Sequence, residues 1–228
     1  MIEPHEYCFS PENQEIKIWK YMDFTKFIDF IMNKTLYFTR SDRFGDSFEG
    51  TISAQDVTER NSQCGHDGQT LWTQFGKEIK KTFFVNCWHI NENESYAMWK
   101  IYLNSQNGIA LQTTYSKLYK CLNEVNDNIY LSTVKYDGNG DWGTYLDRML
   151  HKKSYYSYEQ ELRAIVNDNI RINEDGLKIE VNINNLIENI YVAPSSPIWF
   201  QQLVKNISNY FNFDFTPINS ALDCNPIY

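Results

Sequence analysis

The sequence has few of the residues and segments that would take it out of the globular class. Only 10 glycines and 6 prolines occur among 228 residues, which excludes collagenous, disordered and linker-dominated chains. No segment approaches the ~20 consecutive apolar residues of a membrane-spanning helix. The stretch 1–15 lacks the apolar core of a secretion signal. We therefore expect a cytoplasmic globular protein that does not enter a membrane.

Positive charge is scarce as well. Lys and Arg number 21 against 29 Asp and Glu, which gives a formal net charge of -8. This balance argues against a general nucleic-acid-binding protein, because such proteins bind the phosphate backbone through an excess of cations. Aromatic residues are abundant at 16%, but they fill cores more often than they stack on ligands. Composition alone therefore assigns no function.

The cysteines lack the pairing of a disulfide framework or a zinc knuckle. They are odd in number and never spaced C-x-x-C: Cys8, Cys64, Cys87, Cys121 and Cys224. We expect free thiols. Cys64-x-His66 and Cys87-x-His89 offer the ligand types of a tetrahedral zinc site but not its usual spacing, so we expect no metal. A Cys87 nucleophile activated by His89 is a further alternative, although no oxyanion hole is evident.

Hydrophobic periodicity predicts strands and helices in an irregular order, which favours an α+β fold with mixed or antiparallel central sheets and flanking helices. The segment 82–90 is apolar on both faces and should be a central strand. The length suits a single domain over 1–228, with a core of about 16–211 that includes a closing helix before a short tail. Other strands are expected at 16–21, 36–40, 108–114, 128–136, 160–166, 177–183 and 190–192, and helices at 24–33, 71–81, from an Asn91 or Asn93 cap to 104, 117–123, 145–153 and 198–211.

Two carboxylates and a cation alternate near residue 160. On a strand, Glu159, Glu161 and Arg163 would share one face. The simpler interpretation is a solvated sheet edge. The functional interpretation is a pair of carboxyls with different protonation, of which one accepts a hydrogen bond from a sugar hydroxyl and the other orients a nucleophile.

Two further segments carry candidate ligand-binding residues. The buried strand ends in Trp88 and His89, and Trp99 follows on the next expected helix; the alternative is that these residues are structural members of the core. Arg40 and Arg43 lie in a polar loop, where either guanidinium could bind a phosphate. The alternative for this loop is an ordinary surface connection anchored by phenylalanines.

Several segments taken together resemble the bacterial and phage family called domain of unknown function 2971. The resemblance covers about 18–163 and departs from the family pattern at Ser47, where proline is common, and at Lys20, where arginine is common. It implies no settled activity. The matching segments are Trp19-Lys20-Tyr21, Leu36-Tyr37-Phe38, Phe44-x-Asp46-x-Phe48-Glu49-Gly50, Cys87-Trp88, Met98-Trp99-x-x-Tyr102, Gly108-Ile109-Ala110 and Glu159-x-Glu161-x-Arg163.

A fainter resemblance is to ADP-ribosyltransferases, which have a cation on the first strand and a late Glu-x-Glu. It implies an ADP-ribosyltransferase-like fold in which Lys20 supports NAD and Glu161 stabilises the oxocarbenium-like transition state. Glu159 would then activate or position the acceptor. In place of the Ser-Thr-Ser of those enzymes, this chain has Asn86-Cys87-Trp88.

These resemblances predict an ADP-ribosyltransferase-like enzyme that cleaves NAD and modifies a protein or nucleic acid, as a toxin or a phage-defence effector. The catalytic residues would be Glu161 and Glu159, and Lys20 should lie within ~10 Å of Glu161 because both must reach one NAD. The alternative is a non-enzymatic partner-binding protein, either a defence component or an inhibitor. The residues expected to bind NAD are Lys20, Tyr21, Arg40, Trp88, His89, Trp99 and Arg163.

Overall fold

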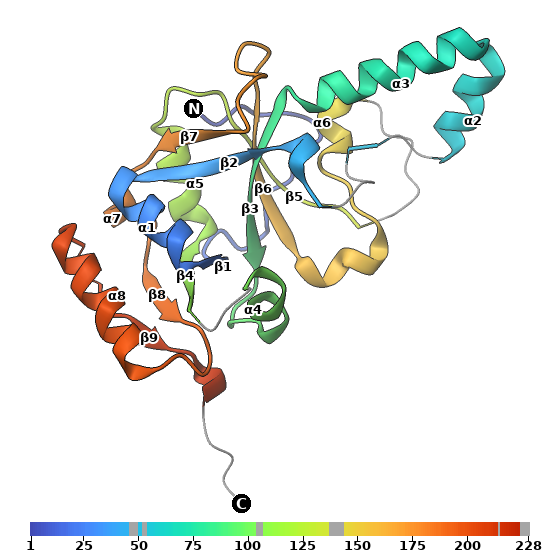
Figure 1. Ribbon diagram of the computed structural model, residues 1–228. Coiled ribbons are helices and arrows are strands. Elements are labelled where there is room, and N and C mark those ends of the chain that lie inside the picture. The colour runs from blue at the N-terminus through green and yellow to red at the C-terminus, as the bar shows by residue number, and fades with distance from the viewer. Residues whose placement is uncertain (46–49, 52–53, 104–106, 137–143, 214, 224–228) are drawn as a thin grey trace, which may run out of the picture. The chain divides into compact units, whose positions relative to one another are not determined.

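A computed structural model of the protein describes residues 1–228 except 46–49, 52–53, 104–106, 137–143, 214 and 224–228, and except the side chains of 54–56 and 66 (Figure 1). Helices and a mostly antiparallel sheet make this an α+β fold, which confirms the predicted fold class. The chain divides into two compact units. Unit 1 comprises Met1–Ser10, Tyr37–Cys87 and Asn126–Lys178, and unit 2 comprises Pro11–Leu36, Trp88–Val125 and Ile179–Tyr228. The expectation of a single domain stays a prediction.

Unit 1 is built on antiparallel strand pairs. Strands β5 and β6 pair with Leu131 opposite Ala164, and β2 pairs with β3 with Thr39 opposite Val85. Its apolar core includes Phe83, Val85, Leu146, Met149, Leu150 and Ile165. The elements with residues in this unit are β2 (Thr35–Arg40), η1 (Ser41–Arg43), α2 (Ala54–Gln63), α3 (His66–Lys80), β3 (Phe83–Ile90), β5 (Tyr130–Thr133), α6 (Tyr145–Arg148), η2 (Ser154–Glu159), β6 (Glu161–Asn167) and β7 (Gly176–Glu180).

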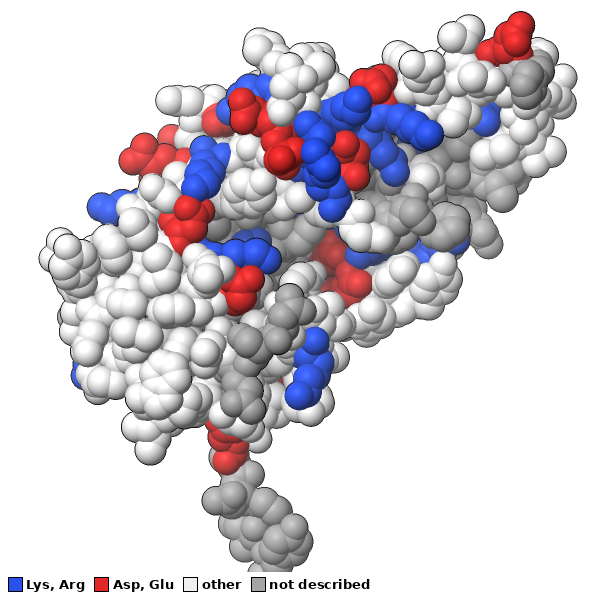
Figure 2. All heavy atoms as spheres, in the orientation of Figure 1, with Lys and Arg blue, Asp and Glu red and all other residues white. Residues whose placement is uncertain are grey.

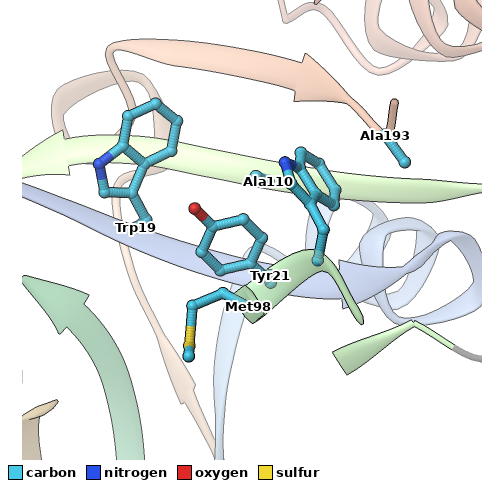
Figure 3. Close-up of a cluster of buried hydrophobic side chains, with 6 residues drawn as sticks. Trp19, Tyr21, Met98, Ala110 and Ala193 are labelled. Carbon is cyan, nitrogen blue, oxygen red and sulfur yellow. The ribbon is translucent and has the colours of Figure 1, made fainter. Parts of the chain in front are cut away.

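Unit 2 is centred on β4, whose residues are all buried and which pairs antiparallel with both β1 and β8. Strand β9 adds in parallel to the far side of β8. Figure 3 shows part of its core, in which Trp19, Tyr21 and Met98 lie near Ala110 and Ala193. The remaining elements are β1 (Lys17–Asp23), α1 (Phe24–Asn33), α4 (Tyr96–Tyr102), β4 (Gly108–Thr114), α5 (Tyr115–Asn123), α7 (Ile183–Leu186), β8 (Asn189–Val192), α8 (Ile198–Tyr210), β9 (Ile218–Asn219) and η3 (Ala221–Asp223).

Local signals place most of these elements. The Asp23 side chain accepts a hydrogen bond from the Lys26 backbone N–H and caps α1, and Lys34 ends that helix in the left-handed conformation. The cap predicted for α4 is wrong. Ser95 caps this helix, because its Oγ accepts from the Met98 N–H, whereas Asn91 uses its own side chain to accept from the N–H of Asn93.

Acidic and basic side chains lie side by side on the face shown in Figure 2. Unit 1 contains several such pairs, for example Arg43 with Asp175 at 2.6 Å and Lys81 with Glu78 at 2.7 Å. In each pair the carboxylate offsets the charge of the cation, so these cations create little positive potential at the surface. This agrees with the excess of acidic over basic residues in the sequence. Among the described residues, no helix is both long enough and apolar enough to cross a membrane.

Candidate functional site

The candidate site is a buried network of two carboxylates and two cations in unit 1. Lys152 Nζ lies 2.5 Å from Glu159 Oε2 and 2.8 Å from Glu161 Oε1. Arg163 Nε donates to the other oxygen, Glu161 Oε2, at 2.6 Å. All four residues are buried, and Arg163 is only 1% exposed. The interpretation of this segment as a solvated edge is therefore wrong.

The network is held in place by backbone contacts of the elements around it. Arg163 Nη1 donates to the carbonyl of Met149, just after α6, at 2.6 Å. The Glu161 N–H donates to the Tyr136 hydroxyl at 2.8 Å. Lys152 is placed by its own N–H, which donates to the Lys135 carbonyl at 2.9 Å. Each side chain thus starts from a backbone segment whose position is fixed by its neighbours.

The two carboxyls have different proton affinities. Burial and a hydrogen bond with Glu161 raise the pKa of Glu159 to about 7. Burial alone would also raise the pKa of Glu161, but the charge of Arg163, the hydrogen bond with Glu159 and the charge of Lys152 together hold it well below its usual range. Near neutral pH the pair therefore contains one permanent anion and one carboxyl that exchanges its proton.

Burial raises the pKa of the Tyr136 phenol above its usual value, as it does for the Glu159 carboxyl, and the negative charge of Glu161 raises it further. The hydroxyl therefore stays neutral at all physiological pH values and can accept the backbone hydrogen bond of Glu161. Tyr136 acts as a fixed support for the start of β6.

The two glutamates do not share a strand face as the sequence predicts. Glu159 ends η2, and Gln160 adopts the left-handed conformation with φ 39° before β6 begins at Glu161. This turn, rather than strand alternation, brings both carboxyls to Lys152. The prediction that they lie together is right, but the geometric reason given for it is wrong.

Gln160 offers a local test of this turn. Its side chain is exposed, so substitutions act through the backbone. A β-branched residue is strongly disfavoured at positive φ, so Gln160→Val should lower the free energy of unfolding by about 1–2 kcal/mol. Gln160→Gly should leave stability unchanged or raise it, because glycine adopts this conformation without steric cost. Urea unfolding of both variants measures the difference, and equal stability would contradict the strained turn.

Arg40 lies in unit 1 with its guanidinium occupied by protein groups. Nε and Nη2 donate to the two carboxylate oxygens of Asp42, at 2.7 and 3.2 Å. Nη1 donates to the carbonyls of Ile172 and Glu174 at 2.7 and 3.0 Å. These hydrogen bonds hold the end of β2 against the segment that precedes β7. A nucleotide phosphate at Arg40 would have to displace these partners.

Other predicted ligand-binding residues belong to the core of unit 2. Tyr21 and Trp99 pack edge to face with ring centroids 4.9 Å apart, and both are buried. The Tyr21 hydroxyl accepts from the Ser95 N–H, and Trp99 Nε1 donates to Glu94 Oε2. His89 is buried next to this pair, with its ring centroid 6.3 Å from that of Tyr21. These contacts give all three residues a structural role.

Lys20 is the most accessible of the predicted unit 2 residues. Its side chain is half-buried, and Nζ lies 5.5 Å from the centroid of the Trp88 ring. This is a cation–π contact to a tryptophan that is itself fully buried. Glu161 belongs to unit 1 and Lys20 to unit 2, so their common cleft stays a prediction.

The cysteines with described positions are free thiols: Cys8, Cys64, Cys87 and Cys121. Cys224 lies outside the described residues. Burial raises the pKa of the Cys8 thiol to about 11, which disfavours a thiolate there. Within the described part of the chain, no cluster of three or more His, Cys, Asp or Glu side chains is placed to hold a metal ion.

Sequence reasoning missed Lys152 and Tyr136. Lys152 lies between α6 and η2, beside an isolated bridge that pairs His151 with Lys135, and Tyr136 lies beyond the end of β5. No motif marks either residue. Only the long-range pairing of these segments brings them to Glu161.

In comparisons with known proteins, no family model, no curated protein and no solved structure matches the chain.

Proposed function

We propose that unit 1 carries the active site of an ADP-ribosyltransferase-like enzyme in which Glu159 is the general base. The observation that supports this most directly is the sharing of one ammonium, Lys152, by two buried carboxyls, of which Glu161 also pairs with Arg163. Neighbouring carboxyls in unlike environments are a recurrent arrangement in acid–base and glycosyl-transfer chemistry. A buried carboxyl whose pKa is raised by burial and by a neighbouring charge is a candidate for acid–base catalysis.

The two glutamates receive different roles from those the resemblance implies. Both oxygens of Glu161 are engaged, one by Lys152 and one by Arg163, and its side chain is 5% exposed. Glu159 contacts Lys152 through Oε2 and is 11% exposed, so it is the carboxyl nearer to solvent. We therefore assign Glu159 to the contact with substrate. Glu161 is a positioning residue that holds Lys152 and keeps the pKa of Glu159 high.

The proposed reaction is transfer of ADP-ribose from NAD to a nucleophile on a protein or nucleic acid. The bond between the ribose C1 and the nicotinamide nitrogen breaks, and its electron pair leaves with nicotinamide. A new bond forms between C1 and the acceptor atom, whose proton passes to Glu159. NAD is a substrate in this scheme, and no redox step occurs. Proton removal by a positioned carboxylate typically accelerates such a step by about 10²–10⁴-fold.

The assay that tests the proposal follows NAD labelled in its adenosine half, incubated with the protein and a cell lysate. The wild-type protein should release nicotinamide and transfer label to a macromolecule. Glu159→Gln should lose most of both signals, because glutamine keeps the shape of the side chain but cannot take a proton. Glu174→Gln is the matched control, since Glu174 is an exposed carboxylate of the same unit.

A wild-type protein that is folded but releases no nicotinamide would contradict the enzyme proposal. Expression in a bacterial host adds a second readout. A toxin or defence effector of this kind should slow growth as wild type and as Glu174→Gln, but not as Glu159→Gln.

A second candidate function is non-enzymatic partner binding, and α3 favours it. Leu71, Trp72 and Phe75 are 67, 51 and 49% exposed on this helix. Large apolar side chains that cluster on a surface are typical of interaction sites. Under this function, Trp72→Ser with Phe75→Ser would abolish capture of the partner, and Glu159→Gln would leave it unchanged.

A further inference from the structure

A second polar site lies in unit 1, between α2 and α3. Figure 1 shows these two helices in succession, joined by a short connection. A pocket of about 480 Å³ that is open to solvent lies between them. Its lining contains two cations, Arg60 from α2 and Lys77 from α3, and its other residues are uncharged amides and hydroxyls. No carboxylate is among the described residues that line it.

The two cations of this pocket differ from their neighbours in their partners. Arg43 and Lys81 each contact a carboxylate within 3 Å, at 2.6 and 2.7 Å. By contrast, neither Arg60 nor Lys77 has an Asp or Glu oxygen within 4.0 Å in the described part of the chain. In a chain with a net charge of -8, two such cations facing one pocket form a local positive field for an anion.

The protein does not use all the N–H donors of the Arg60 guanidinium. Its Nη2 makes a long hydrogen bond of 3.4 Å to Asn61 Oδ1. Its Nε is buried and has no hydrogen-bond acceptor. A buried donor without an acceptor is unfavourable, and an anion at this guanidinium would give the group the bidentate partner for which its planar geometry is suited.

The uncharged part of the lining suits the rest of a small molecule. Asn61, Thr73 and Gln74 line the pocket, and the amide and hydroxyl groups of such side chains can form hydrogen bonds with sugar hydroxyls and base edges. The volume of about 480 Å³ lies in the usual range for small-molecule sites, about 300–1,000 Å³. A free phosphate ion would fill only part of it.

We infer that the pocket between α2 and α3 binds a phosphate-bearing small molecule of nucleotide size, with its phosphates at Arg60 and Lys77. This site is separate from the Glu159 and Glu161 network and does not depend on the enzyme proposal. The uncharged end of the ligand lies against the amides and hydroxyls of α2 and α3.

Isothermal titration with ADP tests the inference, with adenosine and inorganic phosphate as comparison ligands. ADP should bind at least about tenfold more tightly than adenosine, which lacks the charge, and than phosphate, which lacks the nucleoside. The double variant Arg60→Gln/Lys77→Gln should weaken ADP binding by at least about tenfold. Lys81→Gln is the matched control and should keep the affinity within about twofold, because Lys81 pairs with Glu78 and does not line the pocket.

Three results would overturn the inference: no binding at millimolar ADP, equal binding of ADP and adenosine, or unchanged ADP affinity in the folded double variant. If the double variant does not fold, Lys77→Gln alone serves the same purpose, because Lys77 is exposed on α3. The folded double variant also separates this site from the proposed active site. It should bind ADP at least about tenfold more weakly and still release nicotinamide from NAD as the wild type does.

Discussion

Replacing Arg163 by methionine should lower the free energy of unfolding by about 3–5 kcal/mol. Methionine preserves much of the length and the apolar stem of the side chain, so the loss comes from the missing charge and hydrogen bonds. Glu161 would keep Lys152 as its remaining cation, and the Met149 carbonyl would lose the donor that Arg163 supplies at 2.6 Å. A buried anion with an incomplete shell of partners is more costly than a well-packed apolar pair.

Urea unfolding at pH 7 of the wild type, Arg163→Met and Arg171→Met measures this effect. Arg171 is the matched control, because it also pairs with two carboxylates, Asp127 and Asp168, but is 37% exposed. Its loss should cost no more than about 1 kcal/mol. The double variant Arg163→Met/Glu161→Met should recover part of the stability, since it removes both charges. Equal losses at Arg163 and Arg171 would contradict a buried, energetically coupled network.

The strands of the fold follow from local patterns, whereas the partners within the site do not. Strand β4 occupies the predicted range 108–114, which starts with the apolar segment Gly108–Leu111 and ends at Thr114, whose side chain caps the next helix. Helix α2 is missing from the prediction because its sequence is polar and has no apolar face that periodicity could detect. Local signals thus find elements that bury a face and miss those that do not.

For the site, the sequence shows which charges are near each other along the chain but not which partners fold onto them. Glu159, Glu161 and Arg163 stand out by spacing, and the structure does place them together. Lys152 decides whether these carboxyls form a solvated edge or a buried network, and it reaches them through a bridge between Lys135 and His151. Arg40 is the opposite case. Its residue type suggests a phosphate ligand, but its guanidinium donates its hydrogen bonds to groups of the protein itself.

The rate of NAD cleavage should fall as the pH falls through about 7. A general base acts in its deprotonated form, and burial together with the hydrogen bond that protonated Glu159 donates to Glu161 raises the pKa of Glu159 to about 7. Below that value the deprotonated fraction drops tenfold per pH unit, so kcat/KM at pH 5 should be about 100-fold below its plateau at pH 8. An ordinary glutamate, with a pKa near 4.3, would give almost no change over this range.

The groups around Glu159 determine the direction of this shift. Lys152 and Arg163 are cationic and Glu161 stays anionic across the whole range, because the pKa of Glu161 is held below its usual value. The titration between pH 5 and 8 is therefore expected to belong to Glu159. Glu159→Gln should remove the dependence and leave a residual rate at least about 100-fold below the wild-type plateau, while Glu174→Gln keeps the wild-type profile.

Nicotinamide release measured from pH 5 to pH 8, with a melting temperature at each pH, separates loss of catalysis from loss of folding. A wild-type profile that is flat from pH 5 to 8 would place the proton transfer on a different group. A Glu159→Gln variant that keeps the wild-type pH dependence would show the same. In either case the Lys152 network would be structural, and the exposed side chains of Leu71, Trp72 and Phe75 on α3 would become the better starting point for function.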